Sequence, residues 1–172
     1  MIFITVGTTK FLFPRMLKMI DEALLALETK EKVIAQIGNN NYKFSYKYTE
    51  TYNEFPFNKM LYYISHARIV ISHGGCGTML LVLRHAKNKP IVIPRTKLFN
   101  EHIDNHQEYY CKFLKNRRLA EIIFKNENET QNILTYLKSP KTIAGNKTVN
   151  KLKHFTDRLT AYTKEQINMK AE

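Results

Sequence analysis

Residues 69–78 read Ile69-Val70-Ile71-Ser72-His73-Gly74-Gly75-Cys76-Gly77-Thr78, and this stretch decides the fold class. Its β-branched first half predicts a strand buried on both faces, as strands of parallel sheets are. The three glycines predict a tight turn, and Thr78 opens a helical pattern that runs to His85. A buried strand, a tight turn and a helix make up one βαβ-type unit.

The same order recurs on both sides of this unit. Further strands are predicted at 1–6, 33–37, 90–94 and 119–124, with a less regular one at 44–49. Further helices are predicted at 13–27, 57–67, 102–114 and 130–137. Strands that alternate with helices predict an α/β fold, a Rossmann-like parallel sheet with right-handed crossovers and helices on both faces. We expect one domain over residues 1–138, followed by a basic amphipathic helix over 139–172 that packs on the domain or on a partner.

Charge is the unusual feature of the composition. The 172 residues include 27 Lys and Arg but 15 Asp and Glu, which gives a net charge of +12. Such an excess favours an anionic partner, whether nucleic acid, a phosphorylated metabolite or an acidic membrane surface. Two cysteines are too few for a disulfide framework or a zinc site and suit a reducing compartment. With no signal-peptide pattern and no long apolar run, we expect a cytoplasmic protein.

The loop from His73 to Thr78 is the first candidate site. Backbone N–H groups of a glycine-rich turn and the positive end of a helix favour phosphate. The patterns GxxxxGK[ST] and GxGxxG are absent, which argues against a Walker A loop and a standard dinucleotide site. A merely tight turn between strand and helix is the alternative, although one glycine would satisfy it.

The second candidate site is the polar segment Glu101-His102-Ile103-Asp104-Asn105-His106-Gln107. It offers hydrogen bonds in several directions, as a sugar with many hydroxyl groups requires. His102 and His106 have the i, i+4 spacing of metal ligands, but the sequence places no third ligand in obvious reach. We therefore expect no metal.

Four stretches together resemble the C-terminal domain of family 28 glycosyltransferases. They are Ile4-Thr5-Val6-Gly7-Thr8, Gln36-Ile37-Gly38, Ile71-Ser72-His73-Gly74-Gly75, and Val92-Ile93-Pro94-Arg95 running on to Glu101–Gln107. They span about residues 1–125 in the family's order and spacing. The similarity is greatest to the soluble catalytic subunit of two-component capsular and exopolysaccharide transferases. It implies the donor-binding half of a GT-B fold, with residues 1–138 binding a nucleotide sugar.

The resemblance also implies roles for individual residues. The donor diphosphate is expected at Gly7, Thr8, His73, Gly74, Gly75, Gly77, Thr78 and Arg95. The donor sugar is expected at His106 and Gln107, and the candidate catalytic bases are Glu101, His102 and Asp104. Leu81 departs from the family pattern, because related enzymes often place a ribose-binding Glu there.

The implied reaction is an inverting transfer from a UDP-sugar to a polyprenyl-diphosphate-linked acceptor, without a metal or other cofactor. A membrane-anchored partner subunit would bind the acceptor and hold this chain at the inner face of the cell membrane. A UDP-GlcNAc transferase subunit of lipid-linked oligosaccharide synthesis is the near alternative. Two other classes remain open: a basic nucleic-acid-binding module, which lacks any recognised motif here, and a sugar-nucleotide enzyme such as an epimerase.

Overall fold

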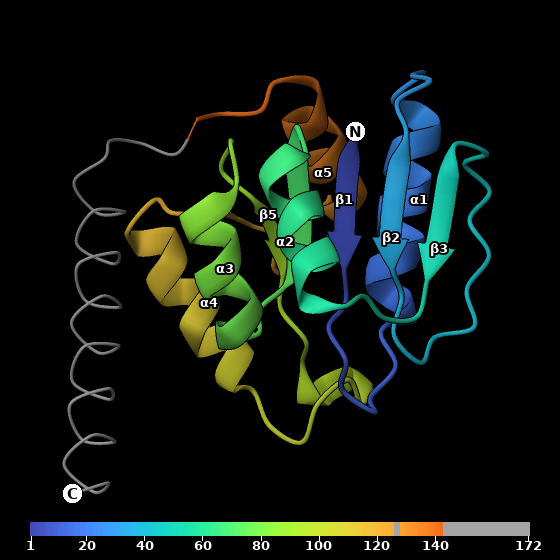
Figure 1. Cartoon of the computed structure of the whole chain (residues 1–172). Helices are drawn as coiled ribbons and strands as arrows, with labels where there is room; N and C mark the ends of the chain where they lie inside the picture. The colour runs from blue at the N-terminus through green and yellow to red at the C-terminus, as the bar shows by residue number, and fades with distance from the viewer. Residues whose placement is uncertain (126–127, 143–172) are drawn as a thin grey trace, which may run out of the picture.

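A six-stranded parallel sheet forms the centre of the molecule (Figure 1). The computed structural model describes residues 1–125 and 128–142. The strands are β1 (Ile2–Thr5), β2 (Val33–Gln36), β3 (Thr49–Tyr52), β4 (Ile69–His73), β5 (Ile91–Ile93) and β6 (Glu121–Ile122). Their order is β3-β2-β1-β4-β5-β6, and every neighbouring pair is parallel. The predicted Rossmann-like α/β fold is confirmed.

Helices cover both faces of this sheet, as expected for crossovers between parallel strands. They are α1 (Pro14–Ala26), α2 (Phe57–His66), α3 (Cys76–His85), α4 (His106–Asn116) and α5 (Glu129–Lys138), with a short 3-10 turn at Lys97–Phe99. Buried residues of α1 and α5 share one core cluster, whereas those of α2, α3 and α4 share the other. Figure 1 shows the second group in front of the sheet.

The central strand β1 explains why the sequence needs a continuous apolar run there. Ile2 and Ile4 belong to the core cluster beneath α1 and α5, while Phe3 belongs to the cluster beneath α2, α3 and α4. All three side chains are fully buried. Burying a side chain of this size is worth about 1.5–3 kcal/mol, so both faces of β1 contribute to stability.

The strand predicted at 44–49 is wrong, because β3 lies later, at Thr49–Tyr52. Residues 42–46 form a loop in which two backbone N–H groups donate to one side chain. The carboxylate of Asp21 accepts hydrogen bonds from the N–H groups of Ser45 at 2.8 Å and Tyr46 at 2.9 Å. With those donors occupied, this stretch needs no neighbouring strand.

The helix predicted from His102 begins instead at His106, and residues 100–105 form turns. Asn100 has a left-handed backbone, with φ of 55°, and ends the 3-10 turn at Lys97–Phe99. Asp104 then accepts a hydrogen bond from the N–H of His106 at 3.1 Å, which satisfies one free donor at the helix start.

The predicted C-terminal helix falls mostly outside the described residues, which end at Thr142. The described part follows α5 without helical structure, and Thr142 pairs with Asn88 in an isolated antiparallel bridge. Among the described residues, no helix has the length and apolar character needed to cross a membrane.

Candidate functional site

The crevice of an open parallel sheet lies where the strand order reverses, beyond the carboxyl ends of the strands. Here the reversal falls between β1 and β4, and Gly7 and His73 lie at those two strand ends. A pocket of about 410 Å³ opens at this point. Its lining residues are Gly7, Thr8, Thr9, Gln36, Phe55, Phe57, Met60, His73, Thr78 and Leu81. Four of the predicted diphosphate residues thus meet in one pocket: Gly7, Thr8, His73 and Thr78.

His73 is buried in the wall of this pocket between two glycines. A Cβ atom on Gly7 would lie 2.6 Å from its Cε1, and one on Gly75 would lie 2.9 Å from its Cδ2. Nδ1 of His73 lies 3.4 Å from the carbonyl oxygen of Thr5, a bond that requires the Nδ1–H tautomer. Burial, with a smaller contribution from Arg95, lowers the pKa of His73 to about 4. The imidazole is therefore neutral at pH 7.

The glycines of the loop after β4 differ in what surrounds them. A Cβ atom on Gly74 would lie 2.7 Å from Sγ of Cys111, and Gly75 is restricted by His73. In contrast, apart from its chain neighbours and the backbone of its own helix, no atom of the described residues lies within 4 Å of the Cβ position of Gly77. Gly77 occupies the first turn of α3, where glycine is a poor helix former. The described structure gives no internal reason for a glycine there, whereas close approach of a ligand to the backbone would give one.

Arg95 is fully buried and binds the backbone. Its Nη1 donates to the carbonyl oxygens of Phe11 at 2.9 Å, Leu12 at 3.1 Å and Glu101 at 3.2 Å. Its Nη2 donates to the carbonyl oxygen of Val6 at 2.8 Å. Burial lowers the pKa of Arg95 to about 10, with Glu101 opposing that shift, so the guanidinium stays charged at pH 7. In this arrangement Arg95 fixes the loop after β1, and its bonds go to carbonyl groups.

Glu101 is also buried and fully engaged. Its carboxylate accepts from Nε and Nη2 of Arg15, both at 2.9 Å, and from the N–H of Thr96 at 3.1 Å. A bidentate arginine pair of this kind is strong and directional. Glu101 therefore holds the loop between β5 and α4 in place through Arg15 and Thr96.

Gln107, predicted to bind the donor sugar, is buried at the start of α4. Its Oε1 accepts a hydrogen bond from the N–H of Arg95 at 3.2 Å. Its Cβ would also be 3.3 Å from a Cβ atom on Gly74. Gln107 thus joins the loop after β5 to the glycine-rich loop after β4.

His102, Asp104 and His106 form a cluster on the same connection. Oδ1 of Asp104 contacts Nδ1 of His106 and lies 3.4 Å from Nδ1 of His102. The backbone N–H of His106, and then its side chain, lower the pKa of Asp104. The sequence offered no obvious third ligand for the two histidines, and the structure places a carboxylate oxygen of Asp104 within 4.8 Å of a ring nitrogen of each.

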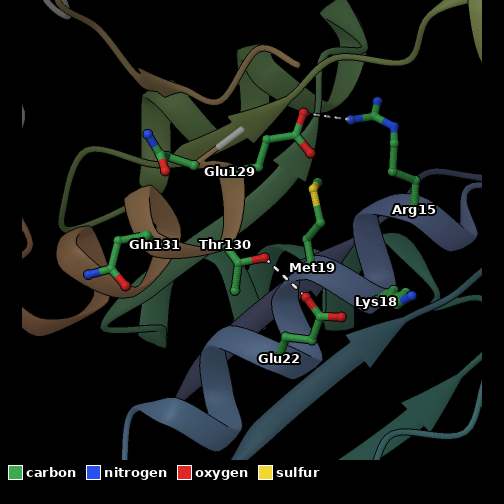
Figure 2. Close-up of a pocket in the computed structure, with 8 residues that line it drawn as sticks. Arg15, Lys18, Met19, Glu22, Glu129, Thr130 and Gln131 are labelled. Carbon is green, nitrogen blue, oxygen red and sulfur yellow. Dashed lines mark hydrogen bonds and ion pairs between the residues drawn. The ribbon is translucent and has the colours of Figure 1, made fainter. Parts of the chain in front are cut away.

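A second pocket, of about 500 Å³, lies between α1 and the start of α5 (Figure 2). Arg15 reaches Glu129 at 3.7 Å there, and Thr130 donates to Glu22 at 3.1 Å. None of the residues predicted to bind donor or acceptor lines it. Arg15 connects this second pocket to the loop between β5 and α4, because it also forms an ion pair with Glu101 of that loop.

Residues 1–161 match the sequence model of a protein family, the "Glycosyltransferase family 28 C-terminal domain". The chain belongs to this family.

This family 28 domain resembles solved glycosyltransferase structures. The glycotransferase of kitacinnamycin aligns with a TM-score of 0.58 and 17% identity, covering 92% of this chain and 39% of that one. CalG4, the calicheamicin glycosyltransferase, aligns with a TM-score of 0.58 and 14% identity. This alignment covers 95% of this chain and 43% of the CalG4 chain. The chain therefore spans about two fifths of the length of each, and at this identity the likeness shows the fold. No curated protein matches the chain in sequence.

Sequence reasoning missed part of the family 28 domain's pocket wall. Phe55 lines the pocket from the connection between β3 and α2, and Phe57 and Met60 line it from the start of α2. Two aromatic residues directly after a strand end were an available signal, since every strand of a parallel sheet ends at the ligand-binding edge. Leu81, where related enzymes often carry Glu, also lines the pocket and makes that wall apolar.

Proposed function

We propose that this chain is the donor-binding half of a UDP-sugar-dependent glycosyltransferase. The observation that carries the proposal is the open space at Gly77, beside a pocket at the reversal of strand order. The first turn of α3 points free N–H groups outward there, and the helix dipole favours a diphosphate. Thr78 lines the same pocket and adds a hydroxyl donor.

We further propose that a membrane-anchored partner provides the acceptor-binding half. Support comes from the resemblance of the four sequence stretches, from Ile4–Thr8 to Glu101–Gln107, to the soluble subunit of two-component transferases. The acceptor proposed is a sugar on polyprenyl diphosphate, and the product would serve capsular or exopolysaccharide synthesis at the inner face of the membrane. A UDP-GlcNAc transferase subunit of lipid-linked oligosaccharide synthesis has the same site requirements.

The proposed reaction inverts the anomeric carbon. An acceptor hydroxyl oxygen forms the new bond to that carbon, the bond to the diphosphate oxygen breaks, and UDP leaves with the electron pair. Backbone N–H groups and the α3 N-terminus stabilise the charge on the leaving UDP, as preorganised donors do. The acceptor proton passes to a base, and His102 and Asp104 are the candidates on this chain, since Glu101 is engaged with Arg15. A base on the partner is the alternative.

Calorimetric titration of the chain with UDP tests the donor site. We expect one UDP per chain, with affinity reduced at least about tenfold in Gly77→Ala, because the methyl group would fill the space left for the diphosphate. Leu80→Ala is the matched control, since Leu80 is exposed on the same helix and does not line the pocket. Binding of UDP that is equal in both variants would contradict the proposed site. Salt-sensitive RNA binding without competition by UDP would support the nucleic-acid alternative.

A further inference from the structure

The cluster of His102, Asp104 and His106 has the composition of a metal site. One ligand atom from each residue can be chosen so that all three lie within 4.8 Å of one another. The imidazole rings of the two histidines meet edge to face, with centroids 4.5 Å apart. Within the described residues, this is the only group of three or more His, Cys, Asp or Glu side chains with such spacing.

His102 provides a second and independent observation. Its Nδ1 is buried and has no hydrogen-bond partner in the described structure, although the carboxylate of Asp104 lies 3.4 Å away. A buried polar atom left without a partner has lost its hydrogen bonds to water without gaining any from the protein. The ring is held in place against Phe11, with centroids 5.5 Å apart. A bound cation would give this nitrogen the partner that it lacks.

The backbone that carries the cluster is held by hydrogen bonds directly before the cluster and within it. Before it, Glu101 is held by Arg15 and by the N–H of Thr96. Within it, Oδ1 of Asn105 accepts from the N–H of Lys97 at 2.8 Å and from the hydroxyl of Thr96 at 3.3 Å. Ligands on a fixed backbone lose little entropy on binding an ion, which favours affinity.

We propose that His102, Asp104 and His106 bind one divalent transition-metal ion of the Zn²⁺ and Co²⁺ type. Two imidazole nitrogens and one carboxylate oxygen suit these ions, whereas Mg²⁺ and Ca²⁺ prefer oxygen ligands. Three protein ligands leave the remaining positions open, as in sites that exchange their outer ligands. The exposed fractions of 54% for Asp104 and 50% for His106 leave those positions facing solvent.

The consequence for transfer rests on the proposed function. The resemblance implies that His106 binds the donor sugar, and His102 and Asp104 are the candidate bases of the proposed reaction, so an ion on the cluster would withdraw all three. The ion would then oppose transfer, whereas binding of UDP at the α3 N-terminus would continue. Direct measurement of the ion and of UDP separates the two proposals.

Titration of the chelator-treated full chain with Co²⁺ tests the site, with visible ligand-field absorption as the readout. We expect one Co²⁺ per chain, displaced by an equivalent of Zn²⁺. His102→Ala and the more conservative Asp104→Asn should each lower the affinity for Co²⁺ at least about tenfold. Even substitutions of residues that only support the ligands of a metal site typically lower metal affinity by this factor. His66→Ala, which removes an exposed histidine of α2, should leave the affinity unchanged.

Circular dichroism of the metal-free variants checks that each remains folded. Failure of Co²⁺ to bind, or equal binding by the cluster variants and His66→Ala, would overturn the metal site. UDP titrations of the same samples report on the donor site separately. Retained UDP binding with no metal binding refutes only the ion, and the reverse result refutes only the donor site.

Discussion

The imidazole of His73 lies against Gly75 so closely that a Cβ atom there would be 2.9 Å from Cδ2 and closer still to Nε2. Gly75 has φ of −73° and ψ of 126°, a conformation open to any residue. The requirement for glycine at this position is therefore steric and comes from one side chain.

Gly75→Ala should lower the free energy of unfolding by about 1–3 kcal/mol, because the added methyl group overpacks a buried ring. Urea denaturation measures the loss. The same substitution in a His73→Ala background should cost much less, since the ring is gone. An equal cost in both backgrounds would mean that His73 is not the cause.

The stability of the chain should fall between pH 7 and pH 4.5 through His73. Its folded pKa of about 4 lies below the ordinary histidine value of 6.5, so the unfolded chain binds the proton more readily. The contribution is complete above pH 6.5 and is lost as the pH falls toward 4, by about 2 kcal/mol at pH 4.5.

Urea denaturation of the wild type and of His73→Asn across this range isolates that contribution. The variant should lose less stability than the wild type, since Asn cannot take up the proton. Parallel pH curves for the two proteins would refute the assignment to His73.

Arg95→Lys should destabilise the fold by about 3 kcal/mol, although it keeps the charge. An ammonium group has three donors and no planar fork, so it cannot reach carbonyl oxygens on both sides of the guanidinium. Thermal and urea denaturation measure the loss. Arg117→Lys, on the exposed end of α4, is the matched control and should change stability by less than about 0.5 kcal/mol.

Asp21→Asn should loosen the loop of residues 42–46. An amide has one acceptor oxygen, whereas the carboxylate accepts from the N–H groups of both Ser45 and Tyr46. One of these donors therefore loses its partner, at a cost of about 1–2 kcal/mol. Hydrogen exchange at Ser45 and Tyr46 should quicken. Glu22→Gln makes the same chemical change at the next, exposed residue and should leave these two amides protected.

Local patterns were enough to predict most of the sheet. The runs at 1–6, 33–37 and 69–72 are β-branched and bounded by turns, and each became a buried strand. The failure at 44–49 has a non-local cause, since Asp21 satisfies that backbone from α1. Propensity describes a segment alone, whereas hydrogen-bond partners come from the whole fold.

The same distinction explains the site. Glycines after a strand predicted where the pocket lies, because strand ends meet at one edge. Whether a polar side chain faces that pocket depends on partners far away in the sequence. Arg95 meets the carbonyl groups of Val6, Phe11 and Leu12, and Glu101 meets Arg15, contacts that no local pattern could reveal.

The place of β1 in the sheet bears on how the chain is synthesised and folded. Ile2 pairs with Val33 on one side and with Ile69 on the other, so the innermost strand is made before either neighbour. A nascent chain that has not reached β4 carries an apolar strand with one unpaired edge. Such edges favour aggregation, and non-local pairing slows folding. We therefore expect this chain to depend on chaperones during translation more than a helical bundle of equal length would.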